Sequence, residues 1–289
     1  VQAFEGSLED WLGSFGGLVI GVSHEGGTWA TNRALATARA SGATLALLTV
    51  SDRSPGAAIA DIVVATEELD QSWCHTVGYL SPMVAAIAVA GHLVAAPVAP
   101  AAARALLDAA LTPAAVGATE AMAANLAGVQ RLIVVATGVD RPAARELVLK
   151  VEEGAHLPAA MRDVETLLHG HLAGMDAQTG LVLILTESAQ AEARASRATG
   201  VLRAAAELGI PAGAILSERH AEAVPARLTP AGRLVVPAAA GLTPAAASLL
   251  GSAVPLQLLT ERLARARGVD PDPIRRDDPA YLRAADAAG

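Results

Sequence analysis

The segment Ser23–Thr28 carries hydroxyl side chains and glycines that suit the binding of an anion or a sugar hydroxyl. It follows an apolar run, Leu18–Val22, and precedes a stretch of helical composition, Thr28–Ala40. At such a strand-to-helix turn, free backbone N–H groups and the helix dipole favour negative charge. Open α/β sheets also bind ligands there. A later turn of the same kind, Thr186–Ala189, has no glycine, so we expect the ligand at the first turn. We call residues 23–28 the ligand loop.

Within the ligand loop, Ser23 and Thr28 supply hydroxyl groups, and Gly26 and Gly27 let a ligand approach the backbone. A tight turn in which Ser23 or Glu25 caps the following helix explains the same composition. Because a pair of glycines is weak evidence, the residues alone leave both interpretations open.

Three ionisable residues, Glu146, Lys150 and Glu153, lie at i, i+4 and i+7 of a helix predicted over residues 141–156. Asp140 is typical of the N-cap of such a helix. Lys150 is the single lysine in the sequence, so any lysine chemistry takes place there. Side chains of these types can exchange protons. On the pattern alone, however, a solvated face with one Glu–Lys pair, worth about 0.3–0.5 kcal/mol, is the favoured interpretation.

Two histidines, His169 and His171, flank a glycine at the end of the next short helix, after Glu165. The sequence has one cysteine and no pair of histidines at helical i, i+4 spacing, so the pattern disfavours a metal site. Capping or solvated histidines are the simpler interpretation. We expect neither a metal nor another cofactor.

The ligand loop belongs to a repeating pattern of strands and helices. In the first half, strands are predicted at 18–22, 44–50 and 61–66, with a helix over 28–40 that ends at Gly42. Strand, helix and strand at this spacing indicate a βαβ unit and a parallel sheet.

The second half repeats this order. Strands are predicted at 181–185, 212–216 and 233–236, with a helix over 191–208, and a further strand at 131–136 precedes them. An uncharged helix follows the third strand in each half. We infer an internal duplication that gives two tandem three-layer α/β/α halves with parallel sheets, flavodoxin-like or Rossmann-like.

These elements suggest three parts of the chain. We place the first half at residues 1–112, the second half at 113–268 and a polar C-terminal arm at 269–289, with a linker at Leu111–Gly117. Nothing within Val1–Phe15 matches the opening strand of the second half. The first half is therefore predicted to lack its opening segment.

Composition and charge argue against several classes of function. Apolar residues make up 53% of the 289 residues, so a large core can form, and the net charge of −8 disfavours a nucleic acid partner. The single cysteine, Cys74, is compatible with a cytoplasmic location. The uncharged stretches 71–103 and 234–260 are long enough to span a membrane, but prolines interrupt both. We expect buried or interface helices there, with no membrane span and no signal peptide.

The segment from Val19 to Val50 resembles the phosphosugar-binding signature of the sugar isomerase (SIS) family. That signature has an apolar strand, then Ser-x-Ser-Gly-x-Thr, a helix, Gly-Ala and a second strand. Ser23, Gly26 and Thr28 match it, and His24 stands where members often have Gln or His. Glu25 replaces a serine that contacts the phosphate in the family. The resemblance implies a sugar ligand, and Glu25 disfavours a phosphate on it.

The helix over 141–156 and the segment after it are similar to the isomerase half of glucosamine-6-phosphate synthase and to related amino-sugar deaminases. Lys150 and Glu153 match a Lys-x-x-Glu pattern, and His169 follows at the family's spacing of 16 residues. The resemblance implies that Glu153 moves a proton between C1 and C2 of the open-chain sugar. It also implies that His169 assists ring opening, reaching in from a neighbouring subunit in some members. His171 replaces the proline of the family's His-Gly-Pro.

Two further features follow from the resemblance. Thr76 stands in a loop that closes over the ligand in the family, although a hydroxyl at a helix cap explains it equally well. The C-terminal arm has Arg275, Arg276 and Arg283 but not the lysine that opens the sugar ring in the synthase. Arginine forms no Schiff base at neutral pH, so ring opening by an arm lysine is not expected.

These considerations give three candidate functions. The first is an aldose–ketose isomerase or an amino-sugar deaminase or deglycase that acts on a sugar or sugar phosphate. The second is a sugar-binding regulatory protein without turnover, and the third is a structural partner in a larger assembly. We expect a homodimer or higher homo-oligomer, with the uncharged helices at 83–96 and 245–260 at its interface.

Overall fold

The computed structural model describes residues 2–8 and 17–288. By its internal contacts the chain divides into two units. Unit 1 comprises Val1–Gln71 and His75–Pro97, and unit 2 comprises Ser72–Cys74 and Val98–Gly289. The short segment Ser72–Cys74 therefore packs with the second unit although its flanking residues pack with the first.

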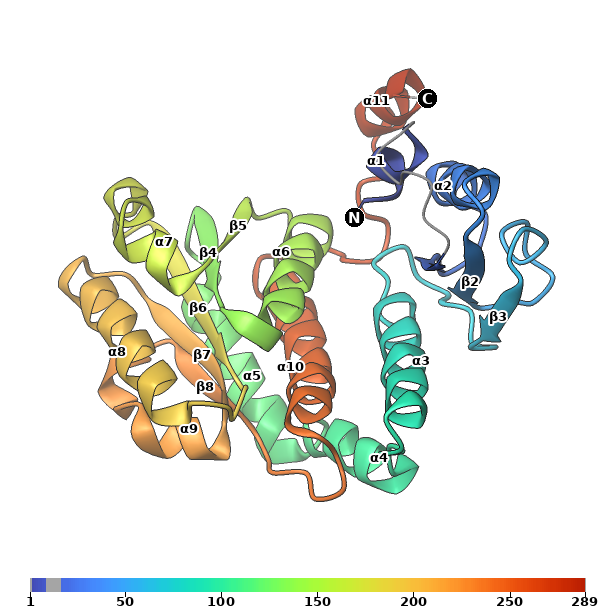
Figure 1. Cartoon of the computed structure of the whole chain (residues 1–289). Helices are drawn as coiled ribbons and strands as arrows, with labels where there is room; N and C mark the ends of the chain where they lie inside the picture. Colours follow the sequence, from blue (N-terminus) through green and yellow to red (C-terminus); the bar gives the residue numbers. More distant parts are fainter. Residues whose placement is uncertain (1, 9–16, 289) are drawn as a thin grey trace. The chain divides into compact units, whose positions relative to one another are not determined.

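Unit 1 is built on a three-stranded parallel sheet in the order β1-β2-β3 (Figure 1). Its elements are α1 (Ala3–Ser7), β1 (Leu18–Val22), α2 (Trp29–Ala40), β2 (Thr44–Thr49), β3 (Ile62–Ala65) and α3 (Val77–Leu93). Leu35 of α2 packs on Leu45 and Leu47 of β2 and forms the core of this unit. This packing fixes α2, and with it the ligand loop, at the carboxyl end of β1.

Unit 2 contains a five-stranded parallel sheet in the order β5-β4-β6-β7-β8. Its strands are β4 (Arg131–Val135), β5 (Ala159–Arg162), β6 (Thr179–Leu185), β7 (Ala212–Ser217) and β8 (Gly232–Val236). Its helices are α4 (Pro100–Ala109), α5 (Pro113–Leu126), α6 (Arg141–Ala155), α7 (Val164–Leu168), α8 (Ala191–Glu207), α9 (Glu218–Ala223), α10 (Pro244–Ala266) and α11 (Pro279–Ala288), with 3-10 turns at Gly138–Asp140, His171–Gly174 and Ala226–Leu228.

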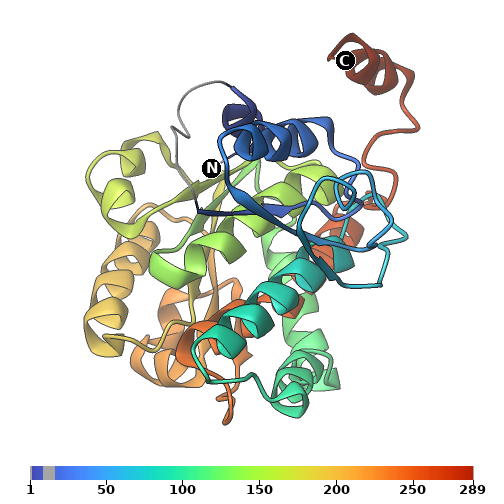
Figure 2. The same cartoon turned by 45° about the vertical axis from the view of Figure 1, so that its right-hand side comes forward.

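Helices cover both faces of this sheet. Helices α7, α8 and α9 lie on one side, and α5, α6 and α10 lie on the other (Figures 1 and 2). Every residue of β6 is buried, as expected for the central strand of a sheet covered on both faces. The predicted α/β fold with two parallel sheets is confirmed.

The internal repeat is also visible in the strand order. The run β6, α8, β7, β8 and α10 follows the order β1, α2, β2, β3 and α3, except that the short helix α9 lies between β7 and β8. Strands β4 and β5 have no counterpart among the described residues of unit 1. The predicted lack of an opening segment concerns Val1–Phe15, of which residues 1 and 9–15 lie outside the described residues.

The structure corrects one local expectation and refines two others. The predicted linker at Leu111–Gly117 is wrong, because α5 begins at Pro113 and Thr112 caps it by accepting the N–H of Ala115. Asp140 occupies the predicted N-cap position of α6, but its side chain makes no cap hydrogen bond and its carboxylate is used elsewhere. The polar C-terminal arm contains a helix, α11, that was not predicted.

The uncharged stretches lie in helices α3 and α10. Most of α10 is buried against α5 and α6, so it belongs to the core of unit 2. The oligomeric state stays a prediction, and α10 offers little free surface to a partner. Over residues 2–8 and 17–288, no helix combines the length and apolarity needed to cross a bilayer.

Candidate functional site

The ligand loop joins β1 to α2, as the sequence predicts. Ser23 is buried, and its hydroxyl donates to the Thr28 hydroxyl at 3.3 Å. Glu25, Gly27 and Thr28 are exposed. The N-cap position of α2 belongs to Thr28, whose side chain accepts no bond from the helix. The exposed rim of the loop is thus open to solvent next to a helix N-terminus, which suits a ligand hydroxyl or anion.

Gly26 holds the loop in its conformation. Its φ of +67° lies in the left-handed region, and a Cβ on Gly26 would fall 2.2 Å from the hydroxyl oxygen of Ser54. Its carbonyl accepts the N–H of Gly56 at 2.8 Å and the side-chain amide of Asn32 at 3.2 Å. Residues of α2 and of the segment around Ser54 therefore fix the loop, and only glycine fits at this position.

Asp70, which the sequence analysis did not single out, links Thr76 to the ligand loop by hydrogen bonds. The ring of His24 accepts the backbone N–H of Asp70 at its Nε2 atom, 3.0 Å away. The Asp70 carboxylate accepts the N–H groups of Thr76 at 2.6 Å and Gly78 at 2.9 Å. An aspartate shortly before a helix is a recognisable capping signal, but its link to His24 spans the sheet and has no local signature.

The second group of candidate residues lies on α6 in unit 2. Lys150 is only 4% exposed, and its ammonium group lies 2.6 Å from Glu153 Oε2 and 3.8 Å from Glu146 Oε1. The interpretation of this face as solvated is therefore wrong. A buried lysine between two carboxylates costs desolvation energy, which the ion pairs offset. Such clusters occur at functional sites and also in structural ion-pair networks.

Glu146 is the member of this cluster whose importance the spacing alone did not reveal. Burial raises the pKa of Glu146 to about 7 from its ordinary value of 4.5; the Lys150 ammonium opposes this rise and the Glu153 carboxylate adds to it. Its Oε1 atom is buried without a hydrogen bond, although the Lys150 ammonium lies nearby. A carboxyl group that titrates near neutral pH suits general acid–base catalysis.

The segment Trp73–Cys74 and the C-terminal arm pack around the end of α6, all within unit 2. A Cβ on Gly154 would lie 3.3 Å from the Cys74 sulfur and 3.2 Å from Pro271. The guanidinium of Arg276 lies 3.7 Å from the centre of the Trp73 ring. Burial raises the pKa of the Cys74 thiol to about 11, a rise that Lys150 opposes. Cys74 is therefore a poor nucleophile at neutral pH.

His169 is not placed with the α6 cluster. Its side chain is 75% exposed, and its Nε2 atom lies 3.3 Å from the Glu165 carboxylate, which Arg197 also contacts. His171 is exposed in the following 3-10 turn. Among the described residues, no group of three or more His, Cys, Asp or Glu side chains could hold a metal ion.

The turn after β6 corresponds to the ligand loop but is closed by the protein's own carboxylates. Asp140 accepts the N–H groups of Thr186 at 2.9 Å and Glu187 at 3.2 Å. Glu187 in turn accepts the N–H of Val139 at 3.2 Å and pairs with Arg194 at 2.9 Å. Because internal anions occupy these donors, the turn has none of the open rim seen at residues 23–28.

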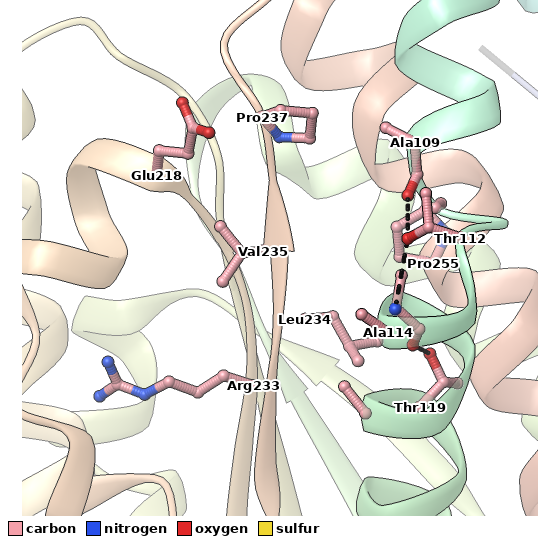
Figure 3. Close-up of a pocket in the computed structure, with 13 residues that line it drawn as sticks. Ala109, Thr112, Ala114, Thr119, Glu218, Arg233, Leu234, Val235, Pro237 and Pro255 are labelled. Atoms are coloured by element: carbon pink, nitrogen blue, oxygen red, sulfur yellow. Dashed lines mark hydrogen bonds between the residues drawn. The ribbon is translucent and has the colours of Figure 1, made fainter.

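A groove of about 410 Å³ runs along β8 in unit 2 (Figure 3). Figure 3 shows Glu218 and Arg233 on one side of it and the small side chains of α5 on the other. The Glu218 carboxylate accepts the N–H of Ala238, and Arg233 donates to the carbonyls of Ala221 and Val224. Both charged groups thus form hydrogen bonds with the backbone, and the rest of the groove is mostly apolar. It lacks the polar groups that would orient a sugar.

No family model matches the sequence, and no curated protein sequence matches it. Solved structures do match. The C-terminal domain of glucosamine-fructose-6-phosphate aminotransferase from Francisella tularensis aligns with a TM-score of 0.73 at 19% identity, covering 88% of this chain and 73% of that one. Tagatose-6-phosphate ketose/aldose isomerase from Escherichia coli aligns with a TM-score of 0.68 at 17% identity, covering 86% and 68%.

Glucosamine-6-phosphate deaminase from Thermotoga maritima aligns with a TM-score of 0.65 at 15% identity, covering 94% of this chain and 77% of that one. At these identities the likeness concerns the fold. The chain therefore has the fold of the sugar isomerase proteins that its sequence resembles.

Proposed function

We propose that the chain is an enzyme that isomerises or deaminates a sugar derivative, either as an aldose–ketose isomerase or as an amino-sugar deaminase or deglycase. The observation that carries this proposal is the buried lysine of α6 between two carboxylates, one of which has a pKa of about 7. The shared fold supports it, since the similar structures bear the names of enzymes of sugar phosphates.

In this proposal the α6 cluster transfers protons. Glu153 removes the proton from C2 of the open-chain aldose, which gives an enediol, and then returns a proton to C1. Glu146 exchanges a proton between the two oxygen atoms, because a carboxyl group with a pKa of about 7 both donates and accepts at neutral pH. Lys150 neutralises the negative charge that develops on the sugar oxygen.

For unit 1 taken by itself, we propose that the ligand loop binds a sugar derivative. Ser23, Thr28 and the backbone around Gly26 offer hydrogen-bond donors at a helix N-terminus. The exposed Glu25 carboxylate repels a phosphate and accepts bonds from an amine or a hydroxyl group. We therefore favour a ligand that presents an amino or hydroxyl group to this loop.

The second candidate is a regulatory protein that binds the sugar without turnover. The direct Lys150–Glu153 ion pair, at 2.6 Å, is compatible with a structural role for both groups. The arm also offers Arg275 and Arg276 where ring opening in the resembling synthase uses a lysine. The two candidates differ in one measurable step, the exchange of the C2 proton with solvent.

The test begins with a thermal-shift screen against free and phosphorylated hexoses, their 2-amino forms and fructosyl-amines. A ligand that binds the folded chain raises the melting temperature. Each hit is then incubated in deuterated water with the wild type, Glu153→Gln and Glu152→Gln. The Glu152 variant is a matched control, because its side chain accepts the N–H of Ala159 through an oxygen that glutamine retains.

The enzyme hypothesis predicts deuterium at C1 or C2, or release of ammonia, in the wild type and the Glu152 variant. We expect Glu153→Gln to lower the rate by about 10²-fold or more. Binding without exchange in the wild type would establish a sugar-binding protein and remove the catalytic role of Glu153. The absence of a shift with every sugar would contradict the assignment of the ligand loop itself.

A further inference from the structure

His24 joins the ligand loop to the segment that carries Thr76. The carbonyl of His24 accepts the N–H of Val50 at 2.8 Å and the hydroxyl of Thr49 at 3.0 Å, so its backbone is fixed to β2 and the residue after it. Its ring then accepts the N–H of Asp70. The His24 imidazole thus links residue 70 directly to the loop.

Asp70 in turn binds the backbone at the start of α3. Its carboxylate accepts the N–H groups of Thr76 and Gly78 and closes a turn over residues 70–78. A Cβ on Gly78 would lie 3.0 Å from Nδ1 of His75, so the His75 ring packs directly over this turn. Thr76 is therefore held by Asp70, and Asp70 is held by His24.

The bond to Asp70 requires a particular protonation state of His24. A ring nitrogen that accepts a backbone N–H carries no proton, so the neutral ring has its proton on Nδ1. A protonated ring would present an N–H to the N–H of Asp70, and the bond would be lost. The contact therefore exists only with neutral His24.

The surroundings of His24 favour this neutral form. Burial lowers the pKa of His24 below 6.5, and the nearby His75, whose ring centre is 5.6 Å away, lowers it further. The carboxylates of Asp70 and Glu25 act in the opposite direction. Burial prevails, so the ring is neutral at physiological pH.

We infer that His24 is a positioning residue whose neutral imidazole holds the turn of residues 70–78, and with it Thr76, in register with the ligand loop. This inference rests on the proposed binding of a sugar at that loop. It assigns His24 a role through Asp70, in addition to any contact of its own with the ligand. Ligand binding should then weaken as His24 is protonated.

Glutamine supplies a matched replacement. The Oε1 atom of glutamine is as many bonds from Cα as Nε2 of histidine, and it accepts an N–H at every pH. His24→Gln therefore retains the bond to Asp70 without its pH dependence, whereas His24→Ala removes the bond. Comparison of the two variants separates the hydrogen bond from the bulk of the ring.

The first measurement needs no ligand. Hydrogen exchange of the Asp70 amide is followed at pH 7.5 in the wild type, His24→Gln and His24→Ala. Loss of one hydrogen bond, a net contribution of about 1 kcal/mol, corresponds to about fivefold faster exchange. We expect this in the alanine variant only. Equal exchange in all three proteins would overturn the inference, whatever the protein binds.

The second measurement uses the sugar identified by the thermal-shift screen. The ratio of the dissociation constants of the wild type and His24→Gln is followed from pH 7.5 to pH 5. Taking the ratio cancels the titration of the ligand. We expect the ratio to rise on acidification, by at most tenfold per pH unit. A constant ratio would refute the positioning role, while failure of both proteins to bind would contradict only the proposed function.

Discussion

At the scale of single residues, the α6 cluster combines a buried carboxyl group with a buried ammonium group. Either charge would cost desolvation free energy if it were buried alone. A carboxyl group at the position of Glu146 is driven towards its neutral form by burial, while Lys150 beside it favours the charged form. The result is a pKa of about 7, at which proton donation and acceptance are equally accessible. The same balance makes the stability of the fold depend on pH.

The direction of this dependence follows from the raised pKa. Between pH 4.5 and pH 7 the folded chain binds more protons at Glu146 than the unfolded chain does, so the stability gained is complete below pH 4.5 and is lost as the pH rises to 7. At 1.36 kcal/mol per pH unit the loss amounts to about 3 kcal/mol. Urea unfolding of Glu146→Gln should lack this decline, and Glu207→Gln, at an exposed position of α8, should retain it. If the free energy of unfolding depended on pH in the same way in all three proteins, the raised pKa of Glu146 would be contradicted.

At the scale of elements, the ligand loop depends on one backbone conformation at the junction of β1 and α2. Gly26 adopts a left-handed φ and leaves no room for a Cβ beside Ser54, whereas a Cβ on Gly27 would meet no atom within 4 Å. The two adjacent glycines therefore have different roles. Gly26 shapes the loop, and Gly27 keeps its rim open.

We expect Gly26→Ala to destabilise the protein by about 1–2 kcal/mol from the left-handed backbone alone, with a further cost for the displaced Ser54. It should also abolish the thermal shift given by the sugar ligand. The free energy of unfolding of Gly27→Ala should lie within about 0.5 kcal/mol of that of the wild type. Denaturant unfolding and the thermal-shift assay measure both effects. Equal losses in the two variants would mean that the Gly26 conformation does not define the loop.

At the scale of the whole molecule, we propose a site shared between subunits, to which His169 of one subunit contributes. His169 is 75% exposed and is not placed beside Lys150 and Glu153 in its own chain. In the resembling family this histidine reaches a neighbouring subunit in some members. We therefore expect a dimer by light scattering; a monomer would count against a shared site.

Complementation tests the shared site directly. Glu153→Gln and His169→Ala should each be inactive alone. When equal amounts are mixed and subunits exchange, half of the dimers contain one subunit of each kind, and one of their two sites is intact. About a quarter of the wild-type activity should therefore return. If mixing restores nothing although subunit exchange is verified, His169 does not act across an interface.

The sequence by itself determined most of the strands and the order in which they occur, although β5 was not predicted. Alternating apolar strands and amphipathic helices are local patterns, so the two parallel sheets, the ligand loop after β1 and the shared helix face of Glu146, Lys150 and Glu153 were all predictable. The start of α5 falls within the segment predicted as a linker, because Pro113 occupies the first turn of a helix, a position that proline favours.

Only the tertiary structure decided how these residues are surrounded. The burial of Lys150, the raised pKa of Glu146 and the bond from Asp70 to His24 depend on segments distant in sequence. The spacing of charges along a helix is the same on a solvated face as on a buried one. Desolvation and long-range hydrogen bonds distinguish the two, and both arise only when the chain has packed.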